Sequence, residues 1–211
     1  MRRIIKDKTP AFWAAFLRKH PKIRYANLND SKEGISVRKQ LHGHMVSHQK
    51  NLCCYCCRII DVETSHNEHI LPQHHFPQFS MDYNNLLASC NDADSCGKEK
   101  DSLYDTKNFI SPLQEDCESH FRFLPDGRVI GNDKAGEKTI AALKLNSYAL
   151  VTQRKLQYNQ CITMAKCLGK EYVFSEYIQE KDGKLPRFVD MVTYFYNEGY
   201  FDPDIMNSNH W

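Results

Sequence analysis

The fold is decided by a run of cysteines in the first half of the chain, which reads Cys53-Cys54-Tyr55-Cys56-Cys57. A second pair, Cys90 and Cys96, follows about 35 residues later. Two cysteine pairs in this layout are typical of a tetrahedral site in which four thiolates bind one zinc ion. The run contains two overlapping Cys-x2-Cys pairs, so the first half of the site is either Cys53 with Cys56 or Cys54 with Cys57.

The segment around these cysteines needs such a crosslink. Residues 51–100 are rich in Cys, His and Asn and show no helical period, so they offer few side chains to a hydrophobic core. Structural zinc contributes roughly 10–16 kcal/mol of apparent binding free energy to folding. The alternative is that the cysteines are buried thiols, because free cysteine is among the most buried residue types. We expect that second role for Cys117, Cys161 and Cys167, which lie outside the cluster.

A second motif lies between the cysteine pairs and reads His66-Asn67-Glu68-His69-Ile70-Leu71-Pro72. Asn85 follows His69 by sixteen residues, and Cys90 comes five residues after that. Each part alone is weak evidence, since Asn84-Asn85 is also typical of a plain turn. The ordered combination, bracketed by the two cysteine pairs, indicates a built site.

Working outward, the sequence predicts helices and one hairpin on either side of this centre. Thr9-Pro10 favours a helix start, and Val37, Leu41 and Met45 form the apolar stripe of the next helix. We expect a helix at 11–17, a helix at 36–50, a hairpin at 119–131, two helices within 136–168 that break near 146–147 and stop at Gly169, and a last helix at 187–196.

The whole chain of 211 residues is predicted to be one α+β domain. Within it we distinguish a basic helical segment at 1–50, the zinc-containing core at 51–105, and a hairpin and helical part at 106–211. The division rests on charge: residues 1–50 hold 12 Lys and Arg against 3 Asp and Glu, whereas the remainder holds 16 against 23. Such an asymmetry favours a polyanionic partner or an acidic docking surface.

Composition also excludes some classes of protein. The sequence has no long apolar run and no apolar segment behind its basic start, so we expect neither a transmembrane helix nor a signal peptide, and no membrane partner. Nine cysteines without an export signal indicate a reducing compartment, and we expect a cytoplasmic protein.

The order acid-His-Ile-x-Pro, then Asn-Leu, then a cysteine pair resembles the zinc-containing branch of the HNH endonucleases. The resemblance implies a zinc-stapled ββα-metal fold that hydrolyses phosphodiester bonds in nucleic acid. It implies His69 as general base, Glu68 as a ligand of a catalytic Mg²⁺ or Mn²⁺, and Asn85 as the residue that orients His69. Since neighbouring side chains of a strand point to opposite faces, we expect an irregular backbone at Glu68 and His69.

The place of the usual third HNH residue, directly after the last cysteine, is occupied by Gly97. This departure puts the third metal ligand in question. The Cys90–Cys96 loop offers Asn91, Asp92 and Asp94 as substitutes, of which we favour Asn91, and His66 is a second candidate ligand. Lys98 and Lys100 are candidate contacts to the phosphates of nucleic acid.

More of residues 1–155 resembles the PtuB-type proteins of Septu antiphage systems, some of them linked to retrons. The matching pattern includes Leu52-Cys53-x-Tyr55-Cys56, Glu68-His69-Ile70, Asn85-Leu86-Leu87-x-Ser89-Cys90 and Cys96-Gly97-x-x-Lys100, and Tyr55 favours Cys53 with Cys56 as the first pair. The resemblance implies a toxic nuclease that is held in check by a PtuA-type ATPase and, where present, by a retron reverse transcriptase with its RNA–DNA hybrid. The target is DNA, or an RNA such as tRNA.

Two other classes of protein compete with this interpretation. A non-catalytic zinc module that binds nucleic acid or a partner protein shares the cysteines and the basic segment but has no use for Glu68, His69 and Asn85 together. A zinc deaminase shares the His-x-Glu spelling of residues 66–68, but its Cys-x2-Cys should follow that motif rather than precede it. A deaminase zinc would also have three protein ligands rather than four sulfurs.

Overall fold

A computed structural model describes residues 1–100 and 104–204 of the chain. Residues 101–103, which fall in the predicted 51–105 core, and residues 205–211 lie outside the described part. The fold mixes helices with two small antiparallel sheets, as the sequence predicts. Its helices are α1 (Ala11–Lys19), α2 (Lys32–His48), α3 (Gly97–Lys100), α4 (Lys134–Ala142), α5 (Tyr148–Leu168), α6 (Lys170–Tyr177) and α7 (Val189–Asn197). Its strands are β1 (Ser65–His69), β2 (Leu86–Cys90), β3 (Phe121–Phe123) and β4 (Val129–Gly131).

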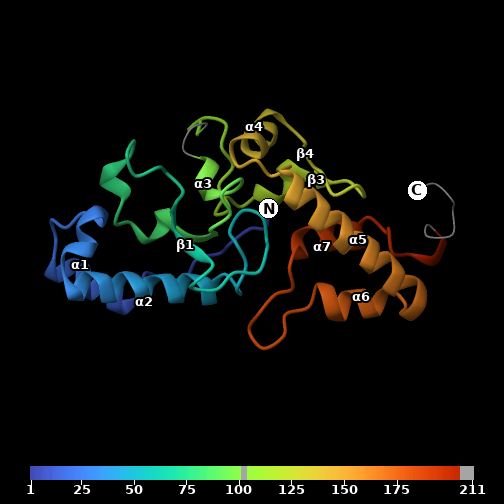
Figure 1. Ribbon diagram of the computed structural model, residues 1–211, viewed down its shortest axis with the longest axis horizontal. Coiled ribbons are helices and arrows are strands. Elements are labelled where there is room, and N and C mark those ends of the chain that lie inside the picture. Colours follow the sequence, from blue (N-terminus) through green and yellow to red (C-terminus); the bar gives the residue numbers. More distant parts are fainter. Residues whose placement is uncertain (101–103, 205–211) are drawn as a thin grey trace.

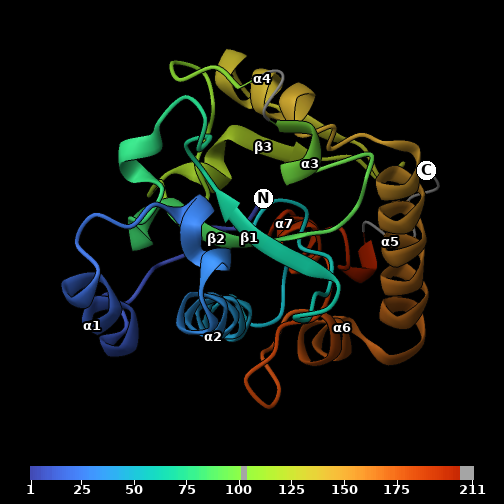
Figure 2. The same cartoon turned by 60° about the vertical axis from the view of Figure 1, so that its left-hand side comes forward.

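The elements are arranged with the predicted centre in the middle. Figure 1 shows α1 and α2 at one end of the molecule and α5, α6 and α7 at the other, with β1 and α3 between them. In Figure 2, α2 is seen end-on beneath the β1–β2 hairpin, and α5 runs along the opposite edge. Because α2 packs against β2, the basic N-terminal helices lie directly beside the central hairpin.

The β1–β2 hairpin positions the residues of the His-Asn-Glu-His motif. The two strands pair antiparallel without interruption from Ser65 opposite Cys90 to His69 opposite Leu86. Strand β2 is buried along its whole length, whereas β1 alternates between buried and half-buried residues. The motif therefore lies on the more exposed strand of the hairpin, next to the buried strand that leads into the second cysteine pair.

Two predicted boundaries are wrong, and caps explain both. Helix α2 begins at Lys32 rather than 36, because the Ser31 side chain accepts a hydrogen bond from the Gly34 amide and caps the helix there. Helix α4 begins at Lys134 rather than 136, because Asp133 accepts from the Gly136 amide in the same way. The Val37, Leu41 and Met45 stripe is buried as predicted.

The C-terminal part follows the predicted order with one addition. Strands β3 and β4 form the predicted hairpin, and α4 and α5 flank the predicted break. Gly169 ends α5 with a φ of 87°, a left-handed conformation that favours glycine. The chain then starts α6 at once, a helix that the sequence analysis does not predict. No helix within residues 1–100 and 104–204 has both the length and the apolar character needed to cross a bilayer.

Two of the three cysteines outside the cluster agree with the core role. Cys117 and Cys161 are fully buried, but Cys167 is exposed, so that prediction is wrong. Cys167 lies six residues after Cys161 on α5, which is roughly 240° around the helix, and it therefore faces away from the core.

Candidate active site

The structure brings together one set of four cysteines. The sulfur atoms of Cys53, Cys56, Cys90 and Cys96 all lie within 4.8 Å of one another, and all four residues are buried. The Sγ atoms of Cys56 and Cys90 are 3.9 Å apart. Thiolates bound tetrahedrally at ~2.3 Å from zinc are roughly 3.8 Å apart, so the donor set fits a zinc ion. This cluster can hold a metal such as zinc, and it selects Cys53 with Cys56 as the first pair.

One arginine lies against the thiol cluster. The Arg58 guanidinium donates to Cys56 Sγ at 3.4 Å and to Cys90 Sγ at 3.3 Å. It also forms an ion pair with Asp92 at 2.7 Å, in the loop between the last two cysteines. A cation beside these sulfurs favours their thiolate forms, which are the forms that bind metal.

Cys54 and Cys57 are also buried but do not belong to the group of four sulfurs. Cys57 packs with Leu52 and Val189, which joins the cysteine run to α7. The ligand set also argues against the deaminase alternative. His66, the histidine of that motif, contacts Glu68 and Asn91 rather than the four-sulfur group.

Glu68 is a buried carboxylate with three partners. Its Oε1 atom accepts from the Tyr55 hydroxyl at 3.0 Å and from the Lys100 ammonium, and its Oε2 atom lies 3.2 Å from His66 Nε2. Burial opposes the charged form of Glu68, but the charge of Lys100 and the hydrogen bonds from His66 and Lys100 outweigh it and lower the pKa of this carboxyl group. Glu68 is therefore held as a carboxylate.

His66 is oriented by Asn91. The Asn91 Oδ1 atom lies 3.0 Å from His66 Nδ1, and the Asn91 amide nitrogen donates to the carbonyls of Glu63 and Ser65. Since a carboxamide oxygen only accepts, His66 Nδ1 carries a hydrogen, and Nε2 faces Glu68. Histidine ligands of metals usually donate their second nitrogen in this way. Without a metal ion Nε2 also carries a hydrogen, which it donates to Glu68 Oε2, and a bound ion would take the place of that proton. The 3.2 Å between His66 Nε2 and Glu68 Oε2 also fits the distance of roughly 3 Å between neighbouring ligand atoms of an octahedral Mg²⁺.

The structure explains why position 97 is a glycine. A Cβ atom at position 97 would lie 2.3 Å from Glu68 Oε2 and 2.9 Å from His66 Nε2. Any side chain there would collide with both groups. The position where the HNH pattern has a third polar residue is thus closed by the close approach of the α3 backbone to Glu68 and His66.

His69 lies on the other face of β1. Its ring packs edge-on against Tyr25 with 4.6 Å between ring centroids, and its Nε2 atom is 3.0 Å from the Ser80 carbonyl oxygen. Because β1 pairs regularly through His69, the irregular backbone that the sequence analysis expects at this point is not observed. The side chains of Glu68 and His69 therefore leave the strand on opposite faces.

Asn85 holds the loop that carries Ser80. Its side chain accepts from the Leu71 amide at 2.7 Å and donates to the carbonyls of Leu71 and Phe79 at 3.2 and 3.1 Å. These bonds close the segment between β1 and β2 on itself. Asn85 thus positions the chain around Ser80, whose carbonyl meets the His69 ring.

The two lysines proposed as phosphate contacts differ. Lys98 is exposed, whereas Lys100 is only 1% exposed. The Lys100 ammonium donates to Glu68 and to the carbonyls of His69 and Ile70, so the expectation of a surface phosphate contact is wrong for Lys100. A buried carboxylate needs a compensating charge, and Lys100 supplies it.

Three neighbours of this site were not found from sequence. The sequence pattern identifies Tyr55 only as part of the family motif and does not predict its hydrogen bond to Glu68. Tyr25 reaches His69 across more than forty residues of sequence, and Ser80 acts through its backbone carbonyl, which every residue type possesses. No local pattern signals contacts of these two kinds.

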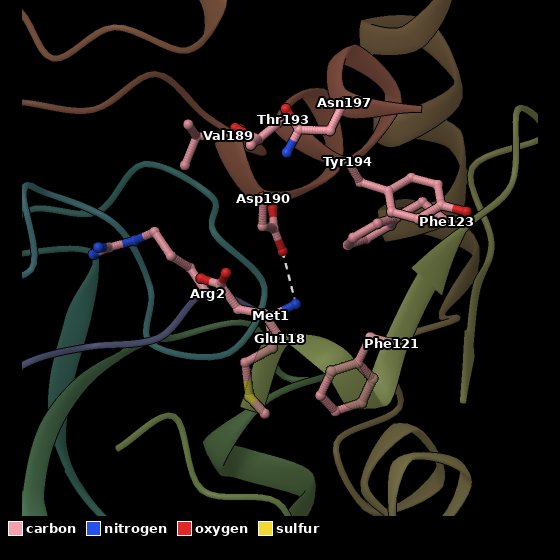
Figure 3. Close-up of a pocket in the computed structure, with 10 residues that line it drawn as sticks. All are labelled: Met1, Arg2, Glu118, Phe121, Phe123, Val189, Asp190, Thr193, Tyr194 and Asn197. Atoms are coloured by element: carbon pink, nitrogen blue, oxygen red, sulfur yellow. Dashed lines mark ion pairs between the residues drawn. The ribbon is translucent and has the colours of Figure 1, made fainter. Parts of the chain in front are cut away.

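A separate pocket lies between the N-terminus and α7 (Figure 3). It measures about 200 Å³, and an ion pair of 2.8 Å between the Met1 amino group and Asp190 crosses it. None of the predicted site residues lines this pocket. The candidate chemistry is therefore at the β1–β2 hairpin.

Comparison with known proteins supports a nuclease. No model of a known protein family matches the chain. A curated protein of Vibrio cholerae serotype O1 biovar El Tor, named "Retron Vc95 putative HNH endonuclease", is 31% identical over 145 residues. The match covers 62% of this chain and 69% of that relative. The chain therefore belongs to the HNH endonuclease family.

Proposed function

We propose that this protein is a metal-dependent endonuclease in which His69 is the general base for phosphodiester hydrolysis. The observation that carries the proposal is the contact between His69 Nε2 and the Ser80 carbonyl. A carbonyl oxygen only accepts hydrogen bonds, so Nε2 carries the hydrogen of the neutral ring. The Nδ1 atom then has the lone pair that takes a proton from water. Asn85 and the loop it closes keep the ring in this orientation.

Glu68 and His66 are the proposed ligands of a catalytic Mg²⁺ or Mn²⁺. When bound, such an ion stabilises the charge that develops on the phosphate and on the leaving oxygen. Asn91 then serves by fixing the His66 ring, and we propose this role for it in preference to direct ligation. His69 is the last residue of β1. We therefore place the scissile phosphate at this end of the strand, between His69 on one face and the Glu68–His66 pair on the other.

The hairpin and α3 form the proposed ββα-metal core. Strand β1 supplies the acid and the histidine, β2 leads into the second cysteine pair, and α3 follows Cys96 directly. This helix has only four residues, and its first residue is the glycine that closes the third position. The four-cysteine cluster joins the start of the hairpin to its end, which supports a closed structural zinc site separate from the catalytic ion.

The biological role proposed is that of toxic effector in antiphage defence. The retron named in the relative's description supports such a setting, and the sequence pattern of residues 1–155 supports the PtuB type. A PtuA-type ATPase is the proposed regulator, with a retron reverse transcriptase where one is present. Expression of the nuclease alone should slow growth, His69→Ala should relieve this toxicity, and co-expression of the ATPase should suppress it in the wild type.

The decisive experiment is a nicking assay with purified protein. We expect the wild type to cut plasmid DNA or RNA in the presence of Mg²⁺ or Mn²⁺, and His69→Ala to lose at least about 100-fold of that activity, the contribution typical of a general base. His75→Ala is the matched control, because His75 is an exposed histidine in the loop after β1. Equal activity of wild type and His69→Ala would reject the assignment. Binding of nucleic acid without cleavage would instead favour the non-catalytic zinc module.

A further inference from the structure

A polar cavity of about 260 Å³ lies between α2 and β1. Helix α2 contributes two cations and a histidine to its wall, and β1 contributes polar side chains. The lining consists of Tyr25, Arg38, Lys39, His42, Ser65, His66 and Asn67. Asn67 leaves β1 on the face opposite Glu68, whereas His66, which contacts Glu68, borders both the cavity and the Glu68 side of the hairpin.

Two buried polar atoms in this wall have no hydrogen-bond partner within the described residues. They are Arg38 Nε, a donor, and Asn67 Oδ1, an acceptor. The orientation of the Asn67 amide follows from its neighbours, since its nitrogen donates to the Tyr25 hydroxyl at 2.6 Å and faces the Arg38 carbonyl at 3.5 Å. Buried polar groups are rarely left unpaired, because each costs about 1–3 kcal/mol. A ligand that offers both an acceptor and a donor would satisfy this pair.

The charge of the cavity selects an anion. Arg38 and Lys39 form no ion pair with any carboxylate among residues 1–100 and 104–204, although other cations of the N-terminal segment do. Planar guanidinium groups bind phosphate oxygens with two parallel hydrogen bonds. The cavity thus combines uncompensated positive charge with a built polar wall.

The cavity adjoins the His69 side of the candidate site through Tyr25. Tyr25 lines the cavity and packs against the His69 ring at 4.6 Å. Asn67 and His69 lie on one face of β1, two residues and therefore about 6.6 Å apart. A group bound in the cavity would be the immediate neighbour of a phosphate at His69.

We infer that this cavity binds the nucleotide next to the scissile bond of a nucleic acid, with its backbone phosphate on Arg38 and Lys39. Asn67 Oδ1 accepts a hydrogen bond from a donor of the same nucleotide, either the ribose 2′-hydroxyl or a base amino group. This inference rests on the proposed function and extends it by naming the substrate contacts outside the catalytic centre.

The test measures binding apart from cleavage. In a His69→Ala background, fluorescence anisotropy with labelled single-stranded DNA and RNA of one sequence gives the affinity at several salt concentrations. Arg38→Gln should weaken binding by roughly ten-fold or more and reduce the salt slope by about one, as the loss of one phosphate contact does. Arg18→Gln is the matched control, since Arg18 is an exposed arginine of the same basic segment and lines none of the described pockets.

Asn67→Ala reports on the donor. A loss of affinity for RNA alone assigns the donor to the 2′-hydroxyl, and an equal loss for both polymers assigns it to the base. Thermal melting of each variant checks that the fold is intact. Unchanged affinity and salt slope in Arg38→Gln would overturn the inference even if the wild type cleaves. If the wild type fails to cleave but Arg38→Gln still loses affinity, the proposed function fails and the binding cavity stands.

Discussion

The Glu68–Lys100 pair is the most consequential contact at the scale of single residues. Both side chains are almost completely buried, at 5% and 1% exposure. The lysine also donates to the His69 and Ile70 carbonyls, so one ammonium ties the acid of the motif to the end of β1. Burying an ion pair is costly, and such a pair persists where each charge is fully satisfied.

Removing Lys100 should therefore destabilise the protein strongly. We expect Lys100→Met to lower the free energy of unfolding by about 3–5 kcal/mol, because it leaves the Glu68 carboxylate buried without a counter-charge. Urea denaturation followed by circular dichroism measures this. Lys98→Met is the matched control, since Lys98 is exposed two residues earlier, and it should change stability by less than about 0.5 kcal/mol. Equal denaturation midpoints for the two variants would contradict the role of Lys100.

Single residues also show how much of the candidate site could be predicted from the sequence. The four cysteines and the Glu68–His69 motif were recognisable because metal and acid–base chemistry restrict the residue types. Lys100 was assigned to phosphate from its charge, and its burial reverses that assignment. The Ser80 carbonyl and the Tyr25 ring reach His69 only through the fold. Contacts made by backbone groups and by distant segments leave no local pattern to find.

At the scale of elements, β2 pairs with β1 alone among the described strands, and a side chain bonds to its other edge. The Gln49 amide, just after α2, donates to the Ala88 carbonyl at 2.8 Å and accepts from the Ala88 amide at 2.7 Å. It donates to the Leu52 carbonyl as well, at 2.9 Å. Gln49 therefore joins α2, the cysteine run and β2 in one buried network.

Gln49→Leu should break that network. It leaves the Ala88 amide buried without its partner, while the Ala88 carbonyl keeps the Cys54 amide as a donor, and we expect a loss of about 1–3 kcal/mol in the free energy of unfolding. Gln40→Leu on the exposed side of α2 is the control and should be nearly neutral. Chemical denaturation of both variants checks this, and a fully stable Gln49→Leu would show that the network adds nothing.

The order of the elements was predictable, but two kinds of detail were not. The hairpin at β3–β4 and the break before α5 follow from turn residues and helix periods, which are local. Helix α6 was missed because it starts directly after the glycine that ends α5, where a stop was expected. The β1–β2 pairing was given only by family resemblance, since the motif residues show no strand alternation of apolar and polar types.

The cysteine cluster joins the cysteine run to the end of β2 and to the start of α3, so we expect its loss to unfold the protein. We expect Cys90→Ser to lose the bound zinc and most of its soluble yield, because structural zinc contributes on the order of 10 kcal/mol to folding. Cys167→Ser removes an exposed cysteine outside the cluster and should keep both. Metal analysis together with thermal melting measures the difference. A soluble, zinc-free and stable Cys90→Ser would argue against a structural metal.

At the scale of the whole molecule, the charge asymmetry of the sequence is partly compensated in the fold. Lys19 pairs with Glu33 at 2.8 Å within the basic segment, and Lys50 pairs with Glu180 of the C-terminal part at 3.0 Å. Residues 1–50 are therefore less uniformly basic as a surface than as a sequence. Arg38 and Lys39 are among the cations of this segment that form no ion pair within the described residues, and they face the cavity beside β1.

One experiment on the intact protein should distinguish the proposed catalytic metal from the proposed structural metal. The four-sulfur cluster is buried, so a zinc ion held there would exchange slowly, whereas an ion on the proposed Glu68–His66 pair must meet substrate. We expect EDTA to stop nicking at once while zinc content and melting temperature remain unchanged. Added Mg²⁺ or Mn²⁺ should restore activity, and a thiol reagent that releases the zinc should abolish it irreversibly with loss of the fold. If EDTA leaves nicking intact, or if activity returns only with added zinc, the separation of a catalytic from a structural metal is wrong.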